Sequence, residues 1–199
     1  MTRANVETGA VLRRELLALA EEDRRTREAL AAAGTLWDGY HPDMEAIHRR
    51  NAARLAEIIE EMGWPSSSLV GEDGAEAAWR VAQHAIGEPE FQRRCLQALQ
   101  RAAETSDVPA WQPAMLEDRI RVFEGRLQRY GTQLEPGEDG TPRPCAMEDP
   151  DNVDRRRRAV GLEPLAARLA REPPIPLPRD RARFDREYQA WLVRTGWRR

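Results

Sequence analysis

Apolar residues recur every three or four positions through most of the first 127 residues, and this helical period most constrains the fold. In the first segment, residues 8–33, arginines and glutamates separate the apolar positions Val11, Leu12, Leu16, Leu19 and Leu30. A second long segment ends at Met62 and begins after Asp38 or at Pro42, because proline suits the first turn of a helix. Its expected buried stripe consists of Met44, Ile47, Leu55, Ile58, Ile59 and Met62.

Three more helical segments follow. One ends near Gly87, the next starts at Glu88-Pro89, and the fifth starts at Pro109 or Trp111. The expected core stripe of the fifth segment consists of Leu116, Ile120, Phe123 and Leu127. Together these segments predict a mainly α fold, an irregular helical bundle.

The period changes after the fifth segment. Residues 130–134 read as extended, residues 137–140 as a turn, and residues 141–147 as a returning arm that Pro142 and Pro144 restrict to an edge. We therefore expect a small β-hairpin near residues 130–147. Short helices follow, and a proline-rich spacer over residues 173–178 leads to a helix over residues 180–193.

The last helix carries four large apolar residues, Phe184, Tyr188, Trp191 and Leu192. Such a face docks on the body of the protein or on a partner. We expect one mainly helical domain over residues 1–171, followed by a spacer and a C-terminal docking helix over residues 172–199. This helix is also the candidate contact for a homo-oligomer.

Composition limits the possible functions. The net charge is −3, so no overall field attracts nucleic acid or an acidic membrane. All 31 basic residues are arginine, which excludes lysine nucleophiles, lysine Schiff bases with pyridoxal phosphate and the P-loop lysine. Cys95 and Cys145 fit no metal-binding spacing, and no signal peptide or membrane-length apolar run is present. These features predict a cytoplasmic protein with reduced thiols.

The stretch from Gly63 to His84 joins a turn to a short helix. Gly63 suits the end of the preceding helix, and Pro65 prevents its continuation. We expect the next helix to start within residues 71–74 and to end in Gln83-His84. His84 either satisfies the last carbonyls of this helix or points with Gln83 into a polar pocket.

Several polar residues lie on or beside apolar stripes of separate elements: Asn51, Gln83, His84, Asp118, Arg119 and Gln133. A buried Asp118 requires a partner, and Arg119 or an arginine or histidine of another helix is the candidate. In a pocket, His84 would be the general acid or base, Asp118 would orient it and Arg119 would bind a carboxylate or phosphate. The expected hydrogen-bonding residues are Asn51, Gln83, Tyr130, Thr132 and Gln133.

Two other interpretations use the same residues. The polar groups can form a purely structural network that fixes helix register. Alternatively, His41 and His48 lie seven residues apart, and with His84 and a carboxylate they would suit iron or zinc, although the spacing matches no recognised motif. Because three scattered histidines are few for such a site, we expect no metal and no other cofactor.

Five short motifs, read together, resemble one protein family. They are Gly63-Trp64-Pro65, Val70-Gly71, Gln83-His84, Asp118-Arg119 and Tyr130-Gly131-Thr132-Gln133. They resemble a bacterial family of uncharacterised helical proteins that is known only as a domain of unknown function. The resemblance spans residues 36–161 and leaves out the N-terminal helix and the segment after the prolines. It implies no activity, only that these positions belong together.

The sequence favours a small-molecule-binding protein, and an enzyme if His84 and Asp118 perform acid–base chemistry in a pocket between helices. The expected partner is a small-molecule ligand, with neither nucleic acid nor membrane. The first alternative is a non-catalytic interaction module with a structural polar network. The second is a metal site of histidines and a carboxylate.

Overall fold

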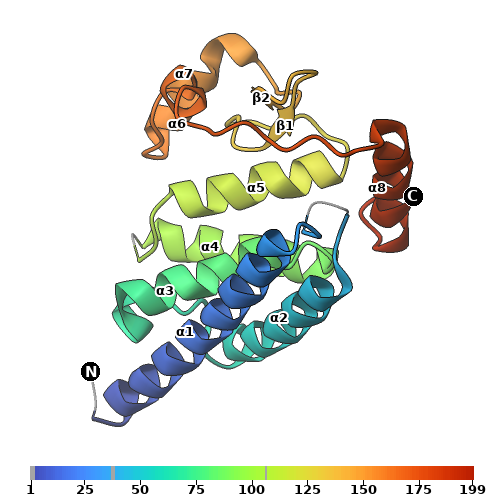
Figure 1. Cartoon of the computed structure of the whole chain (residues 1–199). Helices are drawn as coiled ribbons and strands as arrows, with labels where there is room; N and C mark the ends of the chain where they lie inside the picture. Colours follow the sequence, from blue (N-terminus) through green and yellow to red (C-terminus); the bar gives the residue numbers. More distant parts are fainter. Residues whose placement is uncertain (1–2, 37–38, 106) are drawn as a thin grey trace. The chain divides into compact units, whose positions relative to one another are not determined.

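The computed structural model describes residues 3–36, 39–105 and 107–199, and the fold is mainly α with one small antiparallel hairpin, as predicted (Figure 1). The chain divides into two compact units, one up to Val108 and one from Pro109 to Arg199. The expected division at residue 171, between a helical domain and a C-terminal spacer with its docking helix, stays a prediction. None of the described helices is long and apolar enough to span a membrane.

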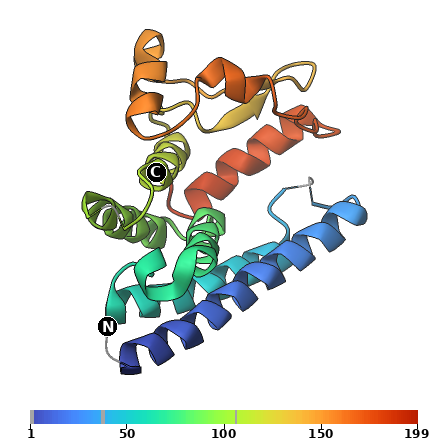
Figure 2. The ribbon, with the colours of Figure 1, turned by 90° about the vertical axis from the view of Figure 1, so that its left-hand side faces the viewer.

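The first unit consists of four helices: α1 (Arg3–Ala32), α2 (Pro42–Met62), α3 (Ser67–His84) and α4 (Pro89–Glu104). Helix α1 is the longest and packs on both α2 and α3, as Figures 1 and 2 show. The start of α2 at Pro42 confirms one of the two predicted starts, and Asp38 lies outside the described residues. The core residues of α1 and α2 include Leu12, Leu16, Met44, Leu55 and Ile58.

Helix α1 approaches the start of α3 very closely at Gly9. A Cβ atom added there would lie 2.2 Å from the carbonyl oxygen of Leu69. A side chain is therefore incompatible with this backbone contact. Further along, the guanidinium of Arg13 binds both carboxylate oxygens of Asp73, at 2.7 and 2.5 Å, which adds a polar contact between the two helices.

Helix α3 starts earlier than the sequence predicted. It begins at Ser67, before the expected range of residues 71–74, and is interrupted at Gly71, where φ is 76° and ψ is 167°. Glycine adopts this conformation without the steric penalty that a Cβ atom brings. The interruption separates a first turn over residues 67–70 from the main helix, and the sequence pattern detected only the main helix.

Three apolar residues of the predicted helical patterns are largely exposed: Val11 at 50%, Met62 at 42% and Leu127 at 49%. Val11 lies beside the buried face of α1, which is formed by Leu12, Leu16 and Ala20. Met62 is the last residue of α2. Leu127 lies beyond α5, which ends at Phe123 and is followed by a turn at Gly125 with a φ of 75°. The helical period was thus extended past the end of α5.

The second unit contains α5 (Trp111–Phe123), a hairpin of β1 (Leu134–Pro136) and β2 (Pro142–Pro144), and the short helices η1 (Pro150–Asn152), α6 (Val153–Ala159) and α7 (Leu165–Leu169). The hairpin pairs Leu134 with Pro144 and Pro136 with Pro142. The predicted hairpin is therefore confirmed. Its two strands have no third neighbour among the described residues, so the prolines interrupt no central ladder.

The C-terminal segment packs within the second unit. The backbone N–H of Ile175, in the proline-rich spacer, donates to the carbonyl of Gly140 at 2.9 Å. Helix α8 (Arg181–Arg194) follows, and the rings of Trp191 and Trp197 lie 5.7 and 5.0 Å from the ring of Phe123. The guanidinium of Arg198 donates to the carbonyl of Phe123 at 3.0 Å, which fixes the chain end near α5.

Candidate functional site

An aspartate lies on the buried face of α1. Asp23 is 2% exposed and follows Leu12, Leu16 and Ala20 along the same side of the helix. An isolated carboxylate is costly to bury, so Asp23 requires partners. Those partners are histidines from two other helices, His48 of α2 and His84 of α3.

His84 binds Asp23 directly. The Nδ1 atom of His84 lies 2.5 Å from Oδ2 of Asp23, and the side chain of His84 is 26% exposed. Because His84 is the last residue of α3, its ring combines a buried anchor with access to solvent. An aspartate that holds one nitrogen of an imidazole while the other nitrogen remains available is the arrangement of many general bases.

His48 is the second imidazole of the cluster and is fully buried. Its Nε2 lies 3.3 Å from Oδ2 of Asp23, and its Nδ1 lies 2.8 Å from the hydroxyl of Tyr40. The rings of His48 and Tyr40 stack at 5.7 Å, while the rings of His48 and His84 lie 5.6 Å apart. The order of contacts is therefore Tyr40, His48, Asp23, His84.

The contacts assign the protons. Burial raises the pKa of Tyr40, so its hydroxyl stays protonated and donates to Nδ1 of His48. The proton of a neutral His48 then lies on Nε2, facing the carboxylate. Because an ionised carboxylate only accepts, Nδ1 of His84 carries the proton of that ring, and its Nε2 keeps a lone pair.

The pKa directions agree with this assignment. Burial alone would raise the pKa of Asp23, but the close contacts and charges of His48 and His84 outweigh it and hold the pKa well below its usual range. Burial lowers the pKa of His84 from its ordinary value of 6.5, and the hydrogen bond with Asp23 offsets only part of this effect. The pair at neutral pH is thus an ionised carboxylate and a neutral imidazole that is ready to accept a proton.

Gln92 of α4 fixes the turn of α3 that ends in His84. Its amide nitrogen donates to the carbonyls of Ala82 and Gln83, at 2.7 and 3.2 Å, and the side chain is fully buried. These carbonyls belong to the last turn of α3, where no helical N–H is available to them. Gln92 therefore positions the backbone that carries His84.

Two buried atoms of the cluster have no hydrogen-bond partner within the part of the chain that the structure describes: Oδ1 of Asp23 and Nε2 of His48. The 3.3 Å contact of His48 with Oδ2 of Asp23 is close enough for a charge interaction. Asp23, His48 and His84 each offer one possible metal-ligand atom, and these three atoms lie within 4.8 Å of one another. Two imidazoles and a carboxylate are a ligand set for zinc or iron.

Asn51 also belongs to this region of the first unit. It lies three residues after His48 on α2, is fully buried, and donates from Nδ2 to the carbonyl of Leu19 at 3.1 Å. Its Oδ1 has no hydrogen-bond partner among the described residues. The contact with Leu19 is structural because it joins α2 to α1.

A separate carboxylate organises the second unit. Asp118 of α5 is fully buried, and its oxygens accept hydrogen bonds from the backbone N–H groups of Arg129, Tyr130 and Thr132 at 2.6–3.1 Å. The hydroxyl of Thr132 donates to Oδ2 at 3.0 Å. The sequence analysis expected an arginine or a histidine as partner, but backbone N–H groups and the hydroxyl of Thr132 supply these donors.

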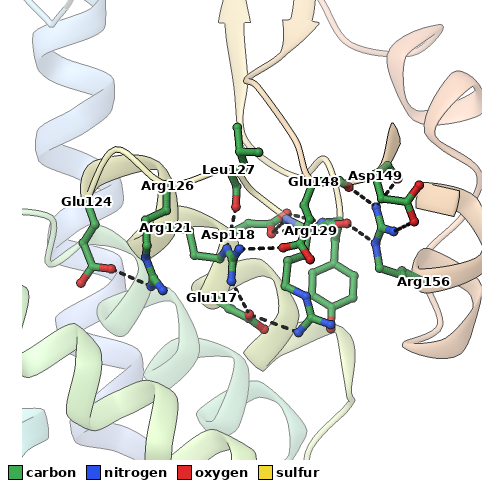
Figure 3. A network of polar contacts seen from close by, with 11 residues as sticks. Glu117, Asp118, Arg121, Glu124, Arg126, Leu127, Arg129, Glu148, Asp149 and Arg156 are labelled. Carbon is green, nitrogen blue, oxygen red and sulfur yellow. Dashed lines mark hydrogen bonds and ion pairs between the residues drawn. The ribbon is translucent and has the colours of Figure 1, made fainter. Parts of the chain in front are cut away.

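The side chains around this loop form an ion-pair network on the second unit (Figure 3). Glu117 lies 3.3 Å from Arg129 and 3.6 Å from Arg121, and Arg121 also binds Glu148 at 2.8 Å. Arg156 donates to the carbonyls of Arg129 and Asp149 at 2.7 and 2.8 Å. These arginines are therefore engaged in holding the segments around α5 together.

Two buried side chains support the same loop, and the sequence analysis named neither. Gln128 donates to the carbonyls of Gln133 and Cys145 at 3.0 and 2.7 Å. Arg157 of α6 donates to the carbonyl of Tyr130 at 2.7 Å and to that of Glu163 at 2.6 Å. Helical or strand periodicity gives no signal for either residue, since both bind the backbone of irregular segments.

The predicted site residues fall into two groups. Asn51, Gln83 and His84 lie in the first unit, with Gln83 buried on α3 beside His84. The others lie in the second unit, where Gln133 donates from Nε2 to the hydroxyl of Thr132 at 3.2 Å. They are Asp118, Arg119, Tyr130, Thr132 and Gln133. The sequence analysis expected Asp118 to contact His84, but the carboxylate that contacts His84 in the structure is that of Asp23. The sequence signal that could have identified Asp23 is its position, as an acidic residue, on the apolar stripe of α1.

The family model for a family of unknown function, DUF6624, matches residues 10–171 of the chain. The chain belongs to this family. The DUF6624 region starts well before residue 36, where the resemblance of the motifs began, so it contains most of α1 and with it Asp23. It also contains His48, His84 and Asp118, and it ends before the proline-rich spacer and α8. No curated protein and no solved structure matches the chain.

Proposed function

We propose that this protein binds a small molecule next to His84 and transfers a proton to or from it, with Asp23 as the orienting residue. The observation that carries the proposal is the 2.5 Å contact between a buried carboxylate and a partly exposed imidazole. A neutral imidazole with a free Nε2 accepts a proton, and the resulting imidazolium is stabilised by Asp23.

The first test concerns the tautomer and needs no substrate. In ¹⁵N-detected NMR of the histidine rings, we expect His84 to carry its proton on Nδ1, against the preference of a free imidazole for Nε2. Asp23→Asn should reduce the Nδ1–H population of His84. An unperturbed His84 with its proton on Nε2 in the wild-type protein would contradict the proposal.

The second test concerns ligand binding and turnover. A thermal-shift screen of small metabolites identifies a ligand, and any turnover of that ligand is then measured for wild type and His84→Gln. We expect the variant to fold and to lose turnover. The matched control is His41→Asn, which removes the third histidine of the chain but keeps a side-chain cap for α2, where His41 now accepts from the N–H of Asp43 at 3.2 Å.

A metal site is the second candidate, and the atoms without hydrogen-bond partners favour it. Oδ1 of Asp23 and Nε2 of His48 are buried, and a cation would satisfy both. The hydroxyl of Tyr40 would then accept from Nδ1 of His48, as a group that orients a metal-bound imidazole commonly does. Two histidines and one aspartate leave coordination positions for water or substrate.

Metal analysis separates the two candidates. Purified protein is measured for zinc, iron and manganese, and the metal-free protein is titrated with Zn²⁺ by calorimetry. Binding of one equivalent that is lost in His48→Ala, together with a shift of the His48 proton to Nδ1, would support the metal site. Absence of any binding would remove this candidate and leave the acid–base proposal.

A purely structural role of the cluster remains the competing interpretation. This interpretation predicts that Asp23→Asn and His84→Gln lower the stability of the protein without changing the binding or turnover of any ligand.

We further propose a cytoplasmic location, supported by two cysteines, Cys95 and Cys145, that form no disulfide.

A further inference from the structure

Arg27 differs from the neighbouring arginines of α1. The guanidinium of Arg24 binds Glu21 and Glu28, and that of Arg25 binds Glu21. For Arg27, no ion pair or hydrogen bond is found within the part of the chain that the structure describes, and its Nε is buried without a partner. A half-buried guanidinium without an anion is costly, since it loses hydration without compensation.

The position of Arg27 relates it to the cluster around Asp23. The two residues are four positions apart on α1, so they lie on the same face, one turn from each other. The positive charge of Arg27 also lowers the pKa of His84, which places the guanidinium within electrostatic range of that imidazole. Arg27 is therefore a cation on the same face of α1 as Asp23, the residue that contacts the candidate base.

We propose that Arg27 binds an oxyanion of the small-molecule ligand, a phosphate or a carboxylate group, next to His84. The planar fork of a guanidinium matches two oxygens of such a group, and partial burial strengthens the interaction. This inference rests on the proposed role of His84 and assigns the ligand class. The sequence analysis had given this role to Arg119, which belongs to the second unit.

The experiment uses inorganic phosphate and acetate as probes on the full-length protein. Each is titrated at pH 7 and followed through the ring signals of His84 by NMR. We expect saturable binding to the wild type and binding that is about tenfold weaker, or more, in Arg27→Gln. Arg27→Lys keeps the charge but not the fork and should give an intermediate affinity. The probe that binds more tightly, phosphate or acetate, shows whether the site prefers a phosphate or a carboxylate group.

Arg25→Gln is the matched control, because it removes an exposed arginine from the same helix. Its phosphate affinity should equal that of the wild type. Bound phosphate should also raise the pKa of His84, because its negative charge offsets the positive charge of Arg27. The other charged or titratable groups that act on this imidazole are Asp23 and His48. Equal phosphate affinity in wild type and Arg27→Gln, or no saturable binding at all, would overturn the inference.

The two proposals fail separately. If Arg27→Gln loses phosphate binding but His84→Gln keeps full turnover of the screened ligand, the anion site stands and the acid–base role falls. If His84→Gln loses turnover while Arg27→Gln binds phosphate like the wild type, the base stands and the anion site falls.

Discussion

Asp23 and His84 are 61 residues apart in the sequence, yet Oδ2 of Asp23 and Nδ1 of His84 lie 2.5 Å apart. The packing of α1 on α3 creates this contact. A change that separates these two helices should therefore affect the site as well as stability.

Stability should decrease on acidification. The pKa of His84 lies below its ordinary value of 6.5 in the folded chain, so the unfolded chain binds more protons between the two values. The contribution of His84 is present above pH 6.5 and is lost as the pH falls through the folded pKa. Urea unfolding at pH 7.5 and at about pH 5 should show a smaller loss in His84→Gln than in the wild type. Equal losses would contradict the lowered pKa.

Gln92→Leu should destabilise the protein by about 1–3 kcal/mol, because two buried carbonyls lose their donor. Backbone hydrogen exchange should also increase at the end of α3. Urea denaturation measures the first effect, and the control is Gln100→Leu on the exposed side of α4, which should change stability by no more than about 0.5 kcal/mol. Similar values for the two variants would exclude a positioning role for Gln92.

Gly9→Ala tests the approach of α1 to α3. Helix propensity alone favours alanine by about 1 kcal/mol. The added Cβ would lie 2.2 Å from the carbonyl oxygen of Leu69, so we expect a net destabilisation of about 1–3 kcal/mol. Ala18→Gly, at an exposed position of α1, should destabilise through propensity alone. A stabilised Gly9→Ala variant would show that the two helices are not in close contact.

Asp118→Asn should destabilise the second unit by at least about 3 kcal/mol, because an amide group would face backbone donors that now bind a carboxylate. Thermal unfolding measures this loss. In the control, Asp139→Asn, an exposed carboxylate that accepts from the N–H of Thr141 is replaced, and the cost should stay near 1 kcal/mol or less. Equal effects would mean that burial adds nothing to the role of Asp118.

The C-terminal helix was predicted as a contact for a homo-oligomer. Val193 of α8 is exposed, whereas Trp191 and Leu192 are buried within the chain. If α8 forms the contact, Val193→Glu should convert an oligomer into monomers without loss of stability. Light scattering after size exclusion measures the mass. An oligomer that persists in this variant would place the contact elsewhere.

The helices could be predicted because their residues follow a period, and their ends because glycine and proline mark them. Pro42 and Gly63 delimit α2 in this way. The early start of α3 could not be predicted, because the interruption at Gly71 breaks the period. A period also does not show where α5 ends, which is why Leu127 was placed in the core.

The site was only partly predictable. His84 stood out because it is a titratable residue at a helix end, but the partner of a side chain depends on tertiary packing. Asp23 lies among four charged neighbours of sequence Glu21, Glu22, Arg24 and Arg25, and this local charge conceals its place on the buried face of α1. Asp118 was recognised as a buried carboxylate, while its backbone donors belong to a loop whose shape no pattern predicts.

The closure of the loop around Asp118 relies on main-chain groups of Arg129 and Tyr130, which every residue except proline possesses. The side chains at these two positions are thus interchangeable as far as this anchor is concerned. Relatives or engineered versions of the protein can therefore vary these two side chains while Asp118 still anchors the main chain of the loop.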